Sequence, residues 1–150
     1  MEAIPSEYII PSGTINISAN GIYSITEYAS ANVSIAAQQG NEEALIKRNI
    51  VNISNNTVTY VGSYAFYRCT TLRTASFPAV ISFYESAFYS CSKLSEIYSP
   101  SATLIGSNAF AYCSSLETIS FPAATYISFA AFRGCSKLSS AIFPSVTKIE

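Results

Sequence analysis

Residues 109–122 read AFAYCSSLETISFP, and this stretch decides the fold because its framework recurs through the rest of the chain. Alanine followed by phenylalanine returns at one constant interval, and so do the cysteine that follows them, the leucine after it and the final proline. The copies start at Ala65, Ala87, Ala109 and Ala131. Five residue types that keep one period without an insertion identify a repeat protein.

The stretch predicts one strand and one turn in each copy. Ile119 and Phe121 are two residues apart and share one face of an extended chain, and Pro122 ends the strand because it has no N–H to donate. Ala-Phe-x-x-Cys predicts a short helical turn that directs Phe110 and Cys113 inward. Because so short a unit cannot bury its own apolar face, we expect the copies to stack into a solenoid. A second extended stretch places one apolar residue before each turn, at Val61, Phe83, Ile105, Ile127 and Ile149.

This framework resembles the BspA-like leucine-rich repeats of bacterial and protist surface proteins, over about residues 50–150. Ala75 and Ala141 stand where the pattern has isoleucine, and Ser99 stands where it has phenylalanine, so we expect a thinner core there. The resemblance implies an α/β, β-rich leucine-rich-repeat solenoid with short helical turns. It also implies adhesion and protein binding as the function, which the spacing by itself does not show.

The first third of the chain follows a different pattern. Residues 12–26 alternate apolar and polar side chains around Asn20 and Gly21, which predicts a β-hairpin over residues 14–26. The segment 13–35 also resembles a motif in tail-associated proteins of phages and prophages from Gram-positive gut bacteria. The alternative origin of the chain is therefore a phage or prophage particle.

The domain organisation follows from where the repeat fades. Residues 41–48, NEEALIKR, predict a helical turn with an asparagine cap and an acidic start. We interpret this turn as the N-terminal cap that a solenoid needs. The prediction is a hairpin segment and linker over residues 1–40, and a solenoid over residues 41–150 whose cap covers residues 41–64.

Composition argues against several classes of function. The net charge is −1 without a basic cluster, so nucleic-acid binding is not expected. The chain has no histidine and no aspartate, which removes the usual triads and general bases, and we expect no enzyme. Glu96 and Glu117 are one residue out of register in adjacent copies, and we interpret them as exposed strand residues.

The four cysteines suggest zinc by their number alone. Their wide and constant spacing places one in each coil, and such a line cannot surround an ion tetrahedrally. We therefore expect reduced, buried thiols and neither a metal nor another cofactor.

The sequence also bears on location. The N-terminus reads MEAIP, without the basic and apolar regions of a signal peptide. Residues 97–116 carry no charge but contain Pro100 and Gly106, so no insertion into a membrane is expected. We expect the protein at the cell surface, outside the cell or on a virion.

The candidate binding surface is the outward face of the predicted strands, with a protein or a glycan as its ligand. This face combines small polar side chains with one aromatic residue, and solenoids use such extended faces for binding. The expected site residues are Arg73, Thr74, Ser76, Ser95, Glu96, Tyr98, Glu117, Thr118 and Ser120. Ser139, Ser140 and Ile142 occupy the same positions in the last copy.

The last copy suggests a second kind of contact. Residues 145–150 form only the extended second half of a coil, so the core positions of the last copy are expected to lie at an open edge. Open edges recruit other strands. We therefore expect self-association through the C-terminal coil, in competition with capping by another hairpin or continuation of the chain.

Overall fold

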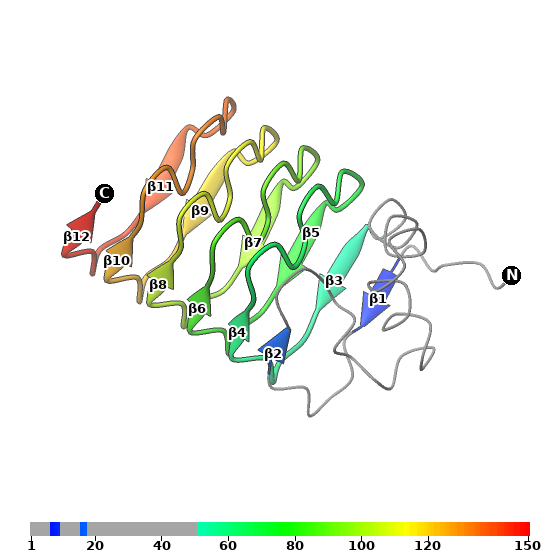
Figure 1. Cartoon of the computed structure of the whole chain (residues 1–150), viewed down its shortest axis with the longest axis horizontal. Helices are drawn as coiled ribbons and strands as arrows, with labels where there is room; N and C mark the ends of the chain where they lie inside the picture. The colour runs from blue at the N-terminus through cyan, green and yellow to red at the C-terminus, as the bar shows by residue number, and fades with distance from the viewer. Residues whose placement is uncertain (1–6, 10–15, 18–50) are drawn as a thin grey trace, which may run out of the picture.

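In the computed structural model, which describes residues 7–9, 16–17 and 51–150, the chain forms a solenoid of stacked coils (Figure 1). Each complete coil contributes one three-residue strand and one two-residue strand. The three-residue strands are β1 (Glu7–Ile9), β3 (Asn52–Ser54), β5 (Thr74–Ser76), β7 (Glu96–Tyr98), β9 (Thr118–Ser120) and β11 (Ser140–Ile142). The two-residue strands are β2 (Asn16–Ile17), β4 (Tyr60–Val61), β6 (Ser82–Phe83), β8 (Leu104–Ile105), β10 (Tyr126–Ile127) and β12 (Lys148–Ile149).

Equivalent strands of neighbouring coils pair in parallel, and each residue lies opposite the residue one repeat later in the sequence. Ala75 of β5, for example, lies opposite Ile97 of β7. The two-residue strands form one six-stranded sheet in the order β12-β10-β8-β6-β4-β2. The three-residue strands form a four-stranded sheet, β1-β3-β5-β7, and a separate pair, β9 and β11. The predicted solenoid is confirmed, and one period of the sequence repeat is one turn of the stack.

The core between these sheets is a ladder of phenylalanine rings. The ring centroids of Phe66 and Phe88 are 4.9 Å apart, those of Phe88 and Phe110 are 5.2 Å apart, and those of Phe110 and Phe132 are 5.6 Å apart. The rings are nearly parallel, with angles of 19°, 6° and 7° between their planes. Each coil therefore buries its apolar face against the next coil, as a solenoid requires.

The segment Ala-Phe-x-x-Cys forms tight turns in place of the helical turn that the sequence predicted. In one coil, the N–H groups of Phe110 and Tyr112 donate to the carbonyls of Ala131 and Arg133 in the next coil, at 2.8 and 2.6 Å. The N–H of Cys113 instead donates within the coil, to the carbonyl of Phe110 at 3.2 Å. This alternation replaces the i→i−4 bonds of an α-helix. Within the described residues there is no α-helix, and so none that is long and apolar enough to cross a membrane.

Left-handed backbone makes the alternation possible. Two residues of each turn have a positive φ between 54° and 71°, although only one of the eight is glycine. Such a φ is costly for other residues and persists where the surrounding structure fixes it. The pairs are Tyr64 and Arg68, Ser86 and Ser90, Asn108 and Tyr112, and Ala130 and Gly134.

Two strands of the N-terminal third already belong to the stack. β1 pairs in parallel with β3, and β2 pairs in parallel with β4. Apart from β2, the predicted hairpin over residues 14–26 lies outside the described residues. The predicted helical turn over residues 41–48 and the boundary between residues 40 and 41 lie outside them as well.

Candidate functional site

The outer face of the three-residue strands carries the residues that the sequence singled out. Along β9 the central Ile119 is buried, whereas Thr118 and Ser120 are exposed. The alternation follows from the pleat, which points successive side chains to opposite faces. Of the nine predicted residues, Arg73, Ser95, Glu96, Tyr98, Glu117, Thr118 and Ser120 are exposed, and Thr74 and Ser76 are half-buried.

A hollow of about 620 Å³ opens on this face, over β5, β7, β9 and β11. It brings together seven of the nine predicted residues and leaves out Arg73 and Glu117. The lining therefore combines short hydroxyl side chains with an apolar floor, and Glu96 is its one carboxylate. Ser140 and Ile142, which the sequence placed at the same outward positions of the last copy, line the hollow as well. The lining residues that sequence reasoning did not include in the site are Ala75, Ile97 and Ile119.

The hollow follows a break in the sheet. β5 pairs with β7 and β9 pairs with β11, but β7 and β9 do not pair. Ile97 in the centre of β7 is half-buried, whereas its counterparts Ala75 and Ile119 are buried. The break thus exposes apolar side-chain surface beside backbone groups that make no ladder bonds between these two strands. Such backbone groups are ready partners for a ligand.

The break follows β7, one of two three-residue strands in the described repeats that are not followed by phenylalanine; the other is β3, which is followed by Asn55 and still pairs with β5. Ser99 stands where other coils have Phe77, Phe121 and Phe143. It is buried, and its Oγ donates a hydrogen bond of 2.9 Å to the carbonyl of Phe77. The hydroxyl is therefore satisfied, as a buried polar group must be, but it fills much less of the core than a ring. In the sequence, Ser99 in place of phenylalanine was the one signal near the break between β7 and β9. It predicted a thinner core but not the break itself.

Tyr98 is the most prominent side chain of the hollow. It is 60% exposed, and Ile142, which also lines the hollow, is 54% exposed. The counterparts of Tyr98 in β5 and β9 are Ser76 and Ser120. An exposed ring among short side chains can pack against a partner while its hydroxyl still reaches a polar group. The geometry suits recognition by shape and aromatic packing.

The cysteines lie in the interior and not on this face. The Sγ atoms of Cys91 and Cys113 donate hydrogen bonds of 3.0 and 3.1 Å to the carbonyls of Phe66 and Phe88. Across the described ranges, no three histidine, cysteine, aspartate or glutamate side chains gather as a metal site would require. All four thiols are free, with Cys69, Cys91 and Cys113 buried and Cys135 half-buried.

Burial also suppresses the ionisation of Cys91 and Cys135. Loss of solvation raises the pKa of Cys91 well above its ordinary value of 9.0, and hydrogen bonds with Cys113 and Cys69 raise it further. Loss of solvation, with a smaller contribution from Cys113, raises the pKa of Cys135 to about 12. Because the thiolate is the reactive form, both burial and protonation protect these side chains.

We expect the folded protein to react slowly with a thiol reagent such as DTNB near neutral pH, and Cys135 to react before the other three. Protein unfolded in guanidinium should titrate four thiols, because unfolding gives the reagent access to all of them and restores the ordinary pKa of Cys91 and Cys135. The absorbance of the released chromophore over time measures both states. Four thiols that react in the folded state as fast as in the unfolded state would contradict the buried placement.

The C-terminal coil covers its core residues less completely. Phe132, Leu138, Phe143 and Val146 are half-buried there, and Ile149 is 67% exposed. This is the surface through which the sequence predicts self-association. That association stays a prediction.

Solved structures with the same architecture place the fold among known proteins. A leucine-rich repeat protein from Bacteroides ovatus is 26% identical, with a TM-score of 0.71 over 98% of this chain and 34% of its own. A leucine rich cell surface protein from Faecalibacterium prausnitzii is 25% identical, with a TM-score of 0.72 over 98% of this chain and 38% of its own. The chain thus spans little more than a third of the length of either protein.

A more distant structure agrees on the fold. The leucine rich repeat protein of T. pallidum is 17% identical, with a TM-score of 0.61 over 99% of this chain and 72% of its own, and shows the fold alone.

The sequence comparisons identify the family. No curated protein matches the chain. The family described as BspA type leucine rich repeat region matches residues 38–150, in six copies. The chain therefore belongs to the BspA-type leucine-rich repeat family.

Proposed function

We propose that this chain is a non-enzymatic module that binds a protein partner through the outer face of its three-residue strands. The hollow over β5, β7, β9 and β11 carries the proposal, because an exposed aromatic ring, an apolar floor and short hydroxyls meet there. Protein interfaces concentrate their binding energy in such aromatic anchors, surrounded by contacts of lesser energy.

The chemistry of the hollow favours binding over catalysis. Its lining offers Glu96 as a carboxylate but no second carboxylate, no amine and no guanidinium. General acid–base work needs a group with a matched pKa and a partner that positions it. Hydroxyl groups without such a partner serve as hydrogen-bond donors and acceptors.

We also infer display at a cell surface. The relative from F. prausnitzii, which is a cell surface protein by name, aligns with 98% of this chain. A low share of charged residues, 11%, leaves exposed tyrosines and hydroxyls to make contacts. The alternative role in a phage particle depends on residues 13–35, which the structure describes only at β2, so it stays a prediction.

The test is a binding screen with the purified chain on an array of extracellular proteins and on a glycan array. We expect wild-type protein to bind one or more proteins, and Tyr98→Ala to weaken that binding by about 30-fold, as loss of a hot-spot side chain does. The affinity of each array partner is then measured by surface plasmon resonance, with circular dichroism as the check of folding.

Phe129→Ala is the matched control, because Phe129 is 61% exposed and Tyr98 is 60% exposed, while only Tyr98 lines the hollow. This variant should bind within about twofold of wild type. Equal losses from both variants would show that the strand face is not the site. Binding confined to glycans would replace the protein partner with a carbohydrate one.

A further inference from the structure

A second line of contacting side chains runs along another part of the coils, at the turns. The ring of Tyr67 stacks on that of Tyr89 at 5.2 Å, and Tyr89 meets Tyr112 edge to face at 5.3 Å. An arginine closes each end, with Arg68 5.3 Å from the centre of the Tyr67 ring and Arg133 6.0 Å from that of Tyr112. These five residues are called the corner ridge below. It shares no residue with the hollow.

The course of the ridge depends on one glycine. Tyr67 and Tyr89 are a repeat apart, but the next equivalent residue is the buried Ala111, and Tyr112 supplies the third ring instead. A Cβ atom at Gly134 would lie 2.5 Å from Cδ1 of Tyr112, so only glycine leaves room for this ring. The positive φ of Gly134, 71°, is also unstrained in glycine.

Stacking covers the facing sides of the Tyr67 and Tyr89 rings, and Arg68 and Arg133 lie over the rings of Tyr67 and Tyr112. Tyr67 and Tyr89 lie within 14° of parallel, so the face of each ring is turned to the other. Bases and sugars bind aromatic residues mainly by stacking on open faces. What the ridge offers to a ligand is instead its ring edges, with the hydroxyl and guanidinium donors that they carry. Such a row favours an extended partner that accepts hydrogen bonds.

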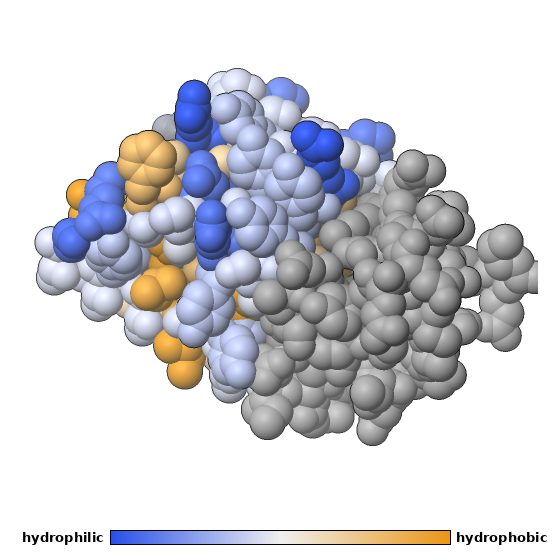
Figure 2. All heavy atoms as spheres, in the orientation of Figure 1, coloured by the Kyte–Doolittle hydropathy of each residue, from blue (hydrophilic) through white to orange (hydrophobic). Residues whose placement is uncertain are grey.

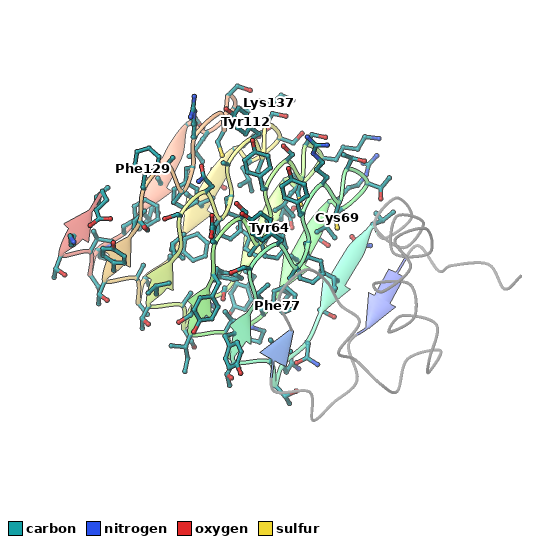
Figure 3. All side chains as sticks on the ribbon, in the orientation of Figure 1. Tyr64, Cys69, Phe77, Tyr112, Phe129 and Lys137 are labelled. Carbon is teal, nitrogen blue, oxygen red and sulfur yellow. The ribbon has the colours of Figure 1, made fainter. Side chains whose placement is uncertain are left out.

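The charges along this corner are positive. Arg68 and Arg133 are exposed, and so are Lys93 and Lys137, each two residues after a core cysteine. Within the described part of the chain, none of these four cations forms an ion pair, since the one pair there joins Lys148 to Glu150. Figure 3 shows Lys137 at the same corner of the coils as Tyr112. Figure 2, which colours the same view by hydropathy, shows a mixture of small hydrophilic and hydrophobic patches on this face.

One carboxylate, that of Glu85, lies beside the ridge. Glu85 accepts a hydrogen bond of 3.2 Å from the hydroxyl of Tyr64, whose ring packs against Tyr67 at 5.6 Å. The contact shows that a tyrosine hydroxyl at this side of the coils can bind a carboxylate. It leaves the guanidinium of Arg68 available.

We propose that the corner ridge binds an acidic, extended segment of a partner protein. Tyrosine and arginine together are among the residues most enriched at protein hot spots, and arginine holds carboxylates in a bidentate fork. Three coil steps separate Arg68 from Arg133, which is roughly 14 Å at the spacing of paired strands. An extended peptide of about five residues covers that length, so carboxylates near its two ends reach both arginines.

The test measures binding of the full chain to fluorescein-labelled poly-L-glutamate by fluorescence anisotropy at low salt. The double variant Arg68→Gln/Arg133→Gln should bind at least about tenfold more weakly than wild type, because it removes both ends of the ridge. Added salt should weaken the wild-type complex and narrow this difference. Circular dichroism verifies that both proteins are folded.

The matched control is Arg73→Gln/Lys148→Gln, which removes the same charge from residues outside the ridge and should change the affinity less than about twofold. Equal losses in the two double variants would overturn the proposal, since net charge would then explain the binding. Heparin and a single-stranded oligonucleotide are the other probes. Binding that depends on Arg68 and Arg133 for either of them, but not for poly-L-glutamate, would also overturn it. The Tyr98→Ala variant should bind poly-L-glutamate like wild type.

Discussion

Replacing Phe110 with alanine is expected to lower the free energy of unfolding by about 3–5 kcal/mol, the usual cost of truncating a buried phenylalanine. Phe110 has no exposed surface and lies in the middle of the ring ladder. Its centroid is 5.2 Å from those of Phe83 and Phe88, 5.6 Å from that of Phe132 and 5.7 Å from that of Phe121. Four rings therefore lose a partner at once, and the coils on either side cannot close the gap without breaking their turns.

The measurement is urea unfolding followed by far-ultraviolet circular dichroism and by tyrosine fluorescence, since the chain has no tryptophan. Glu117→Ala is the control, because Glu117 is exposed at the edge of the strand face, and it should change the free energy by no more than about 0.5 kcal/mol. Similar effects from the two variants would mean that the inward and outward positions are wrongly assigned.

The interior could be predicted from the sequence because the repeat supplies its own alignment. Once Cys91 and Cys113 are known to be equivalent, one coil's burial pattern holds for the next coil, and the structure confirms the inward positions. Stacking adds a strong constraint, because equivalent positions of successive coils lie next to one another. Such a position must therefore carry residues that fit the interior in every coil or residues that fit the surface in every coil. The strand face was identified by the same argument.

The turns could not be predicted because their conformation is decided between coils. Ala-Phe-x-x-Cys is short enough for one helical turn, and nothing in its composition favours a positive φ at Tyr64 or Arg68. The N–H groups gain partners in the next coil only once the stack exists, as in the 2.7 Å bond from Phe66 to Ala87. Tertiary contacts therefore override local propensity here.

The break beside the hollow and the corner ridge were hidden for a related reason. Ser99 was visible as a departure from the repeat, but a small residue predicts only lost volume, not which strands separate. The ridge changes position from Tyr89 to Tyr112, so the period of the repeat alone does not reveal its third ring. The pair Tyr67 and Tyr89, which keeps the period, was the signal that sequence reasoning missed.

Gly106→Ala is expected to lower the free energy of unfolding by about 1–3 kcal/mol, the range found for overpacked cores. A Cβ atom at Gly106 would lie 2.7 Å from the carbonyl oxygen of Phe83, 2.8 Å from the carbonyl carbon of Tyr84 and 3.0 Å from the nitrogen of Glu85. These are backbone atoms of the preceding coil, which cannot rotate away as a side chain could. The two coils must therefore move apart, and the hydrogen bond from the Gly106 N–H to Phe83, at 2.7 Å, must lengthen.

The position equivalent to Gly106 one coil later shows that the close approach of the two coils is local, and it supplies the control variant. Ser128 occupies it, and its backbone nitrogen lies 2.9 Å from the carbonyl oxygen of Ile105, so the coils there are slightly farther apart. Ser128→Ala keeps the Cβ atom and loses only the hydroxyl that contacts Ser107 at 2.9 Å, which should cost about 1 kcal/mol or less. Urea midpoints at constant m-value compare the two variants. If Gly106→Ala is as stable as wild type, the coils must be able to separate at this corner without losing their pairing, and the close packing at Gly106 would contribute little to the stack.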